Sequence, residues 1–259
     1  MCRLVAYIGE PVSPEQLVFD GTHSLYEQSW RPTELLSGSV NADGYGVAWY
    51  GASGLVRIAE MRPIWHDTDL RRTLAAFSSP CVIAALRNAT VGIPVDRSGL
   101  LPLMFGKWSF ALNGFVPDFR ANHMRALRGQ LSDDLYAELA GTSDSETLFL
   151  LAVSALRAGA SPLEALEQTA RFVNDRVGQG VEAQLNMVLS DGERVTAIRS
   201  GTQPVTNSLY VAKRPSVAPN GIVLASEPLD AGTGWEAVDG HSSIDIGSDG
   251  VISTKMLAL

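Results

Sequence analysis

Cys2 is the residue of this chain with the clearest chemical potential, because it directly follows Met1. Initiator methionine is generally removed when the second residue is small, and cysteine qualifies. Removal would place a free α-amine on the residue that carries the thiol. The pKa of such an amine is about 7.7–8.0, so it can act as the base for its own thiol near neutral pH. A cysteine at position 2 is more often without function, so Cys2 needs partners.

Two patterns could bind and activate a substrate. Arg87-Asn88-Ala89-Thr90 ends an apolar, strand-like run, and an arginine there can hold a carboxylate with two hydrogen bonds. Asn113-Gly114 could provide a side-chain amide and a backbone N–H to a developing oxyanion, each commonly worth about 3 kcal/mol of the barrier. The structural alternatives are a surface arginine and a hairpin turn, with Asn113-Gly114 breaking the strand before it.

Two acidic segments could support such a site. Ser143-Asp144-Ser145 precedes a long helix, where Asp144 or Ser145 is the expected cap. A carboxylate fixed and ionised at a helix start could receive a substrate ammonium, and both roles can hold at once. Asn41-Ala42-Asp43-Gly44 is a turn signal that could also brace a strand near the nucleophile.

The elements that must position these residues are strands, then helices, then strands. Apolar patterning predicts a strand over 3–9 and helices over 68–78, 146–157 and 162–177. Ser161, Pro162 and Glu164 form a capping-box start for the last of these helices. Residues 20–40 read as a loop, and the final third is rich in strands, including 221–225 and a pair within 235–257. This order predicts one layered α+β domain rather than a βαβ series.

Composition excludes several classes of protein. The 259 residues carry 20 basic and 28 acidic side chains, a net charge of −8, without basic runs, so nucleic acid and anionic membranes are poor partners. No signal peptide or membrane span is visible. The cysteines number two, and Cys81 is expected to be a buried, inert thiol, which suits a reducing cytoplasm. The four histidines show no metal-ligand spacing, so no metal is predicted, and no cofactor is implied.

The motifs, taken in order, resemble the class II glutamine amidotransferases, a family of N-terminal-nucleophile hydrolases. The resemblance implies a four-layer αββα sandwich over residues 1–259 as a single glutaminase-like domain. It also implies a nucleophile and its base at Cys2, an oxyanion hole at Asn113 and Gly114, an α-carboxylate site at Arg87, an α-ammonium site at Asp144 and a pocket wall at Thr90.

A narrower resemblance concerns the branch of stand-alone glutaminase domains. Met-Cys-Arg, Asn-Ala-Asp-Gly-Tyr-Gly-Val and the run Val-Leu-Ala-Ser-Glu-Pro-Leu at 223–229 are similar to members that cleave γ-glutamyl amides. Leu112 and Val91 depart from the family, which often has histidine at both positions. Because of these departures, the resemblance does not define the outer wall of the pocket or the leaving group that the wall would select.

Three functions follow as alternatives. The first is hydrolysis of a small-molecule γ-glutamyl amide through a Cys2 thioester, favoured because no synthetase region follows the glutaminase region. The second is a glutaminase subunit that supplies ammonia to a separate synthetase. The third is a catalytically silent binding domain of the same fold. Trp30, Arg31 and Trp235 could contact a larger leaving group, with packing as the alternative for the tryptophans. A homo-oligomer is left open.

Overall fold

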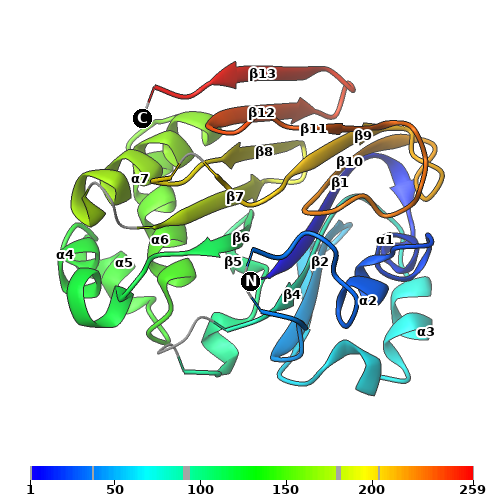
Figure 1. Cartoon of the computed structure of the whole chain (residues 1–259), viewed down its shortest axis with the longest axis horizontal. Helices are drawn as coiled ribbons and strands as arrows, with labels where there is room; N and C mark the ends of the chain where they lie inside the picture. The colour runs from blue at the N-terminus through cyan, green and yellow to red at the C-terminus, as the bar shows by residue number, and fades with distance from the viewer. Residues whose placement is uncertain (1, 37, 90–93, 179–181, 204, 259) are drawn as a thin grey trace.

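Two antiparallel β-sheets face each other, and helices cover the outer face of each (Figure 1). The computed structural model describes residues 2–36, 38–89, 94–178, 182–203 and 205–258. The arrangement is a four-layer αββα sandwich, so the predicted α+β fold class is confirmed. None of the described helices is long and apolar enough to cross a membrane.

The first sheet carries the nucleophile strand near its centre. Its order is β11-β9-β10-β1-β4-β2-β3. The bounds of its strands, in chain order, are β1 Arg3–Val12, β2 Gly44–Gly51, β3 Gly54–Glu60, β4 Ser79–Arg87, β9 Tyr210–Lys213, β10 Gly221–Ala225 and β11 Trp235–Ala237. Because β1 pairs with β4 on one side and β10 on the other, the segment after Cys2 is held along both edges.

The second sheet has the order β13-β12-β8-β7-β6-β5. Its strands, in chain order, are β5 Leu103–Phe105, β6 Trp108–Phe115, β7 Gln184–Ser190, β8 Arg194–Arg199, β12 Ser242–Gly247 and β13 Ile252–Met256. Strand β6 does not end at Asn113-Gly114. Both residues pair with β7, so the expected break in the strand and the hairpin alternative are wrong.

The helices form the two outer layers. The layer on the first sheet contains α1 Pro14–Phe19, α2 Leu25–Gln28 and α3 Leu70–Ala75, and the second sheet carries α6 Asp144–Arg157 and α7 Pro162–Val177. Shorter elements are η1 Ile64–His66, η2 Arg97–Gly99, η3 Phe119–His123, α4 Met124–Arg128 and α5 Asp133–Ala137. Helix α2 lies within the segment that the sequence predicted to be a loop.

The helix starts follow local capping chemistry. Ser161 and Glu164 form the predicted capping box of α7, with Pro162 in its first turn. Helix α6 is capped by Ser143, whose hydroxyl accepts a hydrogen bond from the backbone of Glu146. The expectation of a cap at Asp144 or Ser145 is therefore wrong. The cap at Ser143 leaves Asp144 as the first residue of the helix, with its carboxylate available for other contacts.

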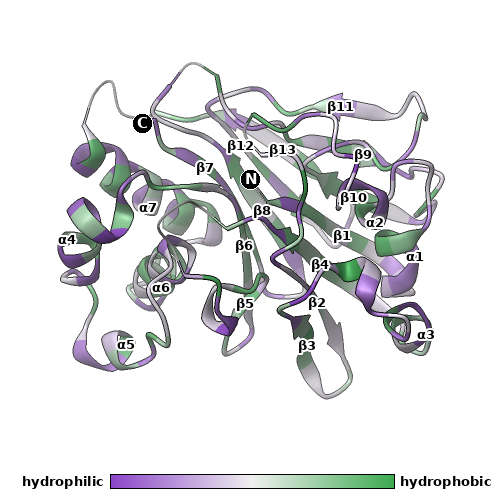
Figure 2. Cartoon of the chain, turned by 60° about the horizontal axis from the view of Figure 1, so that its bottom comes forward, coloured by the Kyte–Doolittle hydropathy of each residue, from purple (hydrophilic) through white to green (hydrophobic). Residues whose placement is uncertain are grey.

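Two hydrophobic clusters fill the spaces between the layers. The central strands of both sheets carry many of the hydrophobic residues (Figure 2). Strand β1 contributes to both clusters by alternation. Leu4 and Ala6 face the second sheet, whereas Val5 and Tyr7 face the outer helices. Cys2 belongs to the same cluster as Leu4 and Ala6. The nucleophile candidate therefore lies at the end of the core between the sheets.

Candidate active site

The first sheet brings Cys2 and Arg87 together at one of its ends. Arg3 pairs with Leu86, so Cys2 lies at the level of Arg87 on the neighbouring strand. Arg87 lies six residues after Cys81 on β4, so both side chains point to the same face of the sheet, toward the space between the two sheets. Strand pairing and alternation together place the predicted nucleophile and the predicted carboxylate ligand on the same face.

A small, partly open hollow lies at this end of the sandwich. Its lining contains four of the residues predicted from the sequence: Cys2, Arg87, Gly114 and Asp144. The other lining residues are Asn88, Ala89, Gly99, Leu101, Ser143 and Ser145. The predicted wall residue Thr90 lies outside the described residues.

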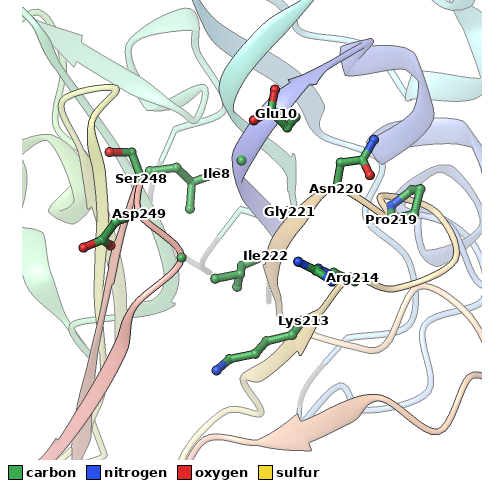
Figure 3. A pocket seen from close by; sticks show the side chains of 12 residues that line it. Ile8, Glu10, Lys213, Arg214, Pro219, Asn220, Gly221, Ile222, Ser248 and Asp249 are labelled. Atoms are coloured by element: carbon green, nitrogen blue, oxygen red, sulfur yellow. The ribbon is translucent and has the colours of Figure 1, made fainter.

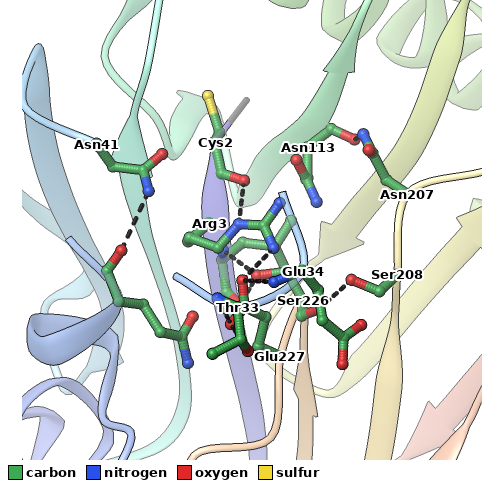
Figure 4. Close-up of polar contacts among 12 residues, drawn as sticks. Cys2, Arg3, Thr33, Glu34, Asn41, Asn113, Asn207, Ser208, Ser226 and Glu227 are labelled. Atoms are coloured by element: carbon green, nitrogen blue, oxygen red, sulfur yellow. Dashed lines mark hydrogen bonds and ion pairs between the residues drawn. The ribbon is translucent and has the colours of Figure 1, made fainter. Parts of the chain in front are cut away.

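The Cys2 thiol is largely buried but borders this hollow. Its side chain and backbone together are 8% exposed. The sulfur lies 3.8 Å from the carbonyl oxygen of Asn88, a weak S–H contact that a reacting substrate can displace. In Figure 4 the thiol points away from the Cys2 carbonyl, which accepts a hydrogen bond from Arg3. The backbone is thus held on one side while the sulfur faces the hollow.

Arg87 is held by backbone oxygens and has no carboxylate within ion-pair distance among the described residues, although its charge helps to lower the pKa of Asp96. Its Nη1 donates to the carbonyl of Asp96 and its Nη2 to that of Pro94, each at 2.9 Å. Each of these nitrogens carries a second hydrogen. The side chain is buried, so an anion that reached it would meet an oriented cation with little competition from water.

Asp144 is a buried carboxylate without an ion-pair partner in the described part of the chain. Its Oδ2 accepts from the backbone N–H of Val116 at 2.9 Å, and its Oδ1 from that of Ser145 at 2.8 Å. Burial raises the pKa of Asp144, and these hydrogen bonds only partly offset the effect. Burial thus works against the ionised state expected from the sequence for Asp144. A bound ammonium would stabilise the charged form of the carboxylate.

Asn113 directly precedes Gly114, which lines the hollow, and its side-chain amide has no hydrogen-bond partner among the described residues. Phe110 stacks on Phe149 of α6, so the alternating residues Ala111 and Asn113 face the first sheet. Neither Asn113 Nδ2 nor Oδ1 has a hydrogen-bond partner among the described residues, although the side chain is fully buried. A buried amide without partners is costly, so the donor of Asn113 is available to a ligand.

A residue that sequence reasoning missed fixes the backbone of Asn113. Asn207 donates from Nδ2 to the Asn113 carbonyl at 3.0 Å (Figure 4). The N–H of Asn207 donates to the side chain of Gln184. Asn186 donates in turn to the carbonyl of Asn207 at 2.9 Å. All of these side chains are fully buried. No local pattern in the sequence signals this network, because its members come from three separate segments.

The Asn41–Gly44 turn braces the end of β4. Asp43 accepts from the N–H of Ala89 at 2.8 Å and donates its own N–H to the carbonyl of Arg87 at 3.1 Å. The segment 41–44 therefore braces a strand beside Cys2, as the second reading of its sequence expected. The buried Asn41 side chain bonds the carbonyl of Gln28, which ties the turn to α2.

The residues suggested for a larger leaving group do not line the hollow. Trp30 packs edge-on against Tyr26 and Trp65, with ring centroids 4.7 and 6.0 Å away. Arg31, three residues after α2, is exposed and pairs with Glu27 of that helix. Trp235 donates its indole N–H to the side chain of Asp230 at 3.0 Å. Packing and local pairing account for these side chains in the structure.

A larger open cleft lies at the other end of β1 (Figure 3). Its lining includes exposed side chains of both signs, Lys213 and Arg214 with Glu10 and Asp249. It contains none of the residues predicted for the site. Among the described residues, no group of three or more His, Cys, Asp or Glu side chains could hold a metal ion.

Comparison with solved structures defines the class of protein by its fold. The chain superposes over its full length on a glutamine aminotransferase class-II domain protein from Silicibacter pomeroyi, with a TM-score of 0.74 and 24% identity over all of that chain. It also matches half of a B. subtilis glutamine phosphoribosylpyrophosphate amidotransferase chain, with a TM-score of 0.68 and 14% identity. These likenesses are those of the N-terminal-nucleophile hydrolase fold.

The chain belongs to the class II glutamine amidotransferase family, whose model matches residues 28–220. It is 32% identical to a γ-glutamyl-hercynylcysteine sulfoxide hydrolase of Mycolicibacterium smegmatis, over 99% of this chain and 100% of the relative. A Mycobacterium tuberculosis protein of the same name is 30% identical over 99% of this chain and 97% of its own length. The predicted family is confirmed, and with it an enzyme of the amidohydrolase type.

Proposed function

We propose that this protein hydrolyses a γ-glutamyl amide with Cys2 as its nucleophile. The observation that carries the proposal is the meeting of Cys2, Arg87, Gly114 and Asp144 around one hollow, although they lie on four separate segments. Arg87 and Asp144 supply opposite charges, which suits the α-carboxylate and α-ammonium of a glutamyl group. The Cys2 thiol lies where the γ-carbonyl of such a group would be presented.

The proposed reaction proceeds in two steps. With Met1 removed, the Cys2 α-amine accepts the thiol proton, and the sulfur attacks the γ-carbonyl to form a C–S bond. Asn113 and Gly114 stabilise the resulting oxyanion. Collapse breaks the C–N bond, and the leaving amine takes the proton. Water then attacks the γ-glutamyl thioester, releasing glutamate and restoring the thiol.

The preferred substrate is γ-glutamyl-hercynylcysteine sulfoxide, which yields hercynylcysteine sulfoxide and glutamate in ergothioneine biosynthesis. Two relatives with this named activity cover the chain almost completely, which supports the choice over other γ-glutamyl amides. Both described cysteines are free, which fits a reducing compartment, and we place the enzyme in the cytoplasm.

The test compares γ-glutamyl-hercynylcysteine sulfoxide with glutamine in the isolated protein, after mass spectrometry confirms that Cys2 is the first residue. We expect a much higher kcat/KM for the sulfoxide. Cys2→Ala should abolish turnover but keep binding by calorimetry, because Arg87 and Asp144 remain. Cys81→Ala is the matched control. The Cys81 thiol is buried in the core, so this substitution should leave turnover unchanged.

Two outcomes would favour the alternatives. A preference for glutamine, or activity only with an added synthetase, would identify an ammonia-supplying subunit. Turnover of neither substrate by protein with a free Cys2 α-amine would indicate a silent binding domain. Near-normal turnover in Cys2→Ala would overturn the mechanism for either enzyme.

A further inference from the structure

A buried ion pair between Arg3 and Glu227 lies next to Cys2, the proposed nucleophile. Arg3 Nη1 and Glu227 Oε1 are 2.6 Å apart, and both side chains are fully buried. Replacing such pairs by apolar residues is often neutral or stabilising, so stability alone does not explain why this pair is buried here. Arg3 Nη2 moreover has no partner among the described residues. The guanidinium of Arg3 is therefore held in one orientation even though one of its donors has no hydrogen-bond partner.

The arginine of this pair also holds Cys2. Its Nε donates to the Cys2 carbonyl oxygen at 2.8 Å, so one guanidinium bonds both Cys2 and Glu227 (Figure 4). Cys2 precedes the first ladder pair of β1, which is Arg3 with Leu86. The bond from Arg3 therefore fixes a part of the backbone that the described strand pairing does not reach.

Glu227 is itself held by several donors from another segment. Thr33 donates from both its N–H and its hydroxyl at 2.8 Å, Glu34 donates its N–H at 3.1 Å, and His23 lies 2.7 Å away through Nε2. Burial raises the pKa of Glu227, but the hydrogen bonds from His23 and Thr33 and the charge of Arg3 lower it to about 2. A carboxylate held by so many donors cannot reorient, and neither can the guanidinium attached to it.

The strand order places this pair opposite the predicted glutamyl site. In the first sheet β1 lies between β10 and β4, and Glu227 follows β10 whereas Arg87 ends β4. We propose that Arg3 and Glu227 are positioning residues that hold the Cys2 backbone so that its thiol faces the substrate bound at Arg87. Neither residue lines the hollow, so both act through Cys2 and not on the substrate.

Several charged or titratable groups surround the pair and belong to different elements. They are Cys2 before β1, His23 before α2, Glu34 after α2 and Tyr210 on β9. Arg199 on β8 interacts in turn with Tyr210 and Glu34. Tyr210 donates its hydroxyl to Glu34 at 2.7 Å. Substitutions at Arg3 and Glu227 that change as little shape as possible are therefore the cleanest probes.

The test measures Cys2 reactivity directly. In protein with a confirmed N-terminal Cys2, iodoacetamide is added to Arg3→Lys and Glu227→Gln variants, and the N-terminal peptide is followed by mass spectrometry. Circular dichroism measures how much of each variant is folded, because an unfolded chain also exposes Cys2 to the reagent. The alkylation rate constant of the folded protein reports how the thiol is placed. Lysine keeps the charge but cannot hold both partners with one planar fork. We expect rate constants lower by on the order of 10- to 100-fold, with kcat reduced in parallel and KM unchanged within about twofold.

Asp245→Asn is the matched control, because Asp245 is also paired with an arginine, Arg194, but lies on the second sheet away from Cys2. It should leave the rate constant unchanged. If Arg3→Lys and Glu227→Gln lower only the folded fraction, and not the alkylation rate constant, the pair is merely structural and the proposal is overturned. If Glu227→Gln does not fold, Arg3→Lys decides alone by the same two readings.

This inference rests on the proposed function only in taking Cys2 as the nucleophile. Alkylation requires no substrate, so the two can fail separately. Wild-type protein that hydrolyses no γ-glutamyl amide would refute the proposed function. Unchanged alkylation rate constants in both variants would refute the positioning role, whatever the substrate proves to be.

Discussion

Gly114 and Gln184 are in such close contact that no side chain can stand between them. A Cβ on Gly114 would lie 1.8 Å from the carbonyl oxygen of Gln184. Gln184 begins β7, and its side chain accepts a hydrogen bond from the backbone of Asn207. The glycine thus lets β7 approach β6 where Asn207 supports Asn113, and the proposed oxyanion donors depend on this approach.

Gly114→Ala should therefore destabilise the protein by about 3 kcal/mol or more, because a backbone oxygen cannot yield as a flexible side chain would. Gly51→Ala, also in a strand, should be nearly neutral, since an added Cβ there meets nothing within 4 Å. Thermal unfolding of both variants checks this. Equal melting temperatures would show that β7 can shift away at little cost.

Asn113→Ala should lower kcat by about 100- to 1000-fold with little change in KM, as expected for the loss of one oxyanion donor. Steady-state kinetics on the γ-glutamyl substrate measure the effect. Asn174→Ala on α7 is the control, since Asn174 also has an unpartnered side-chain oxygen but lies away from the hollow. A rise in KM alone would instead assign Asn113 to substrate binding.

Asp144→Asn should weaken binding of the glutamyl ammonium by about 100-fold, the order of effect seen when a buried charge loses its partner. Because burial raises the pKa of Asp144, the wild-type carboxylate takes up a proton at a higher pH than an ordinary aspartate. As pH falls through that pKa, kcat/KM should decline. The same acid limb should be absent from the pH profile of Asp144→Asn, and its persistence there would point to another group.

Gly99→Ala should disturb the carboxylate site without touching the nucleophile. A Cβ on Gly99 would lie 2.7 Å from Arg87 Nη2, so the guanidinium must move. We expect KM for the γ-glutamyl substrate to rise about tenfold with kcat largely kept, a loss of about 1.4 kcal/mol. Gly234→Ala, with nothing within 4 Å of the added Cβ, serves as the control. Unchanged KM in both variants would remove Arg87 from substrate binding.

Glu227 should contribute to acid stability with a defined sign. Its pKa is lowered from 4.5 to about 2 in the folded protein, so its stabilising effect is present above pH 4.5 and is lost as pH falls toward 2. The shift corresponds to on the order of 3 kcal/mol. The stability difference between wild type and Glu227→Gln should therefore shrink across that interval in urea unfolding. A constant difference would assign the effect to packing and not to charge.

Local chemistry made part of this structure predictable from the sequence. The capping box at Ser161 predicted the start of α7, and the alternation of strand-like runs with turns in the last third predicted 221–225 as a strand. The fold class followed from the order of the elements and the family motifs. The cluster of Cys2, Arg87 and Asp144 was predicted through the same motifs, and the shared hollow agrees with it.

Other features depend on contacts between distant segments. Asn113-Gly114 has the residues of a tight turn, yet pairing with β7 keeps both in a strand, so tertiary contacts override the local preference. The support of Asn113 by Asn207 joins residues 94 positions apart. No spacing rule predicts such a bond, because which strands become neighbours is decided by the whole sandwich.

The ion pair of Arg3 and Glu227 also has a consequence for the time at which the protein becomes active. Its members are 224 residues apart, so at roughly 5 to 20 residues per second the ribosome completes the second about 10 to 45 seconds after the first. Strand β10, which borders β1, is also a late product of translation. If the pair positions Cys2 as proposed, the thiol of a growing chain is exposed before its positioning partner has been synthesised, and hydrolysis must wait until Glu227 has been made.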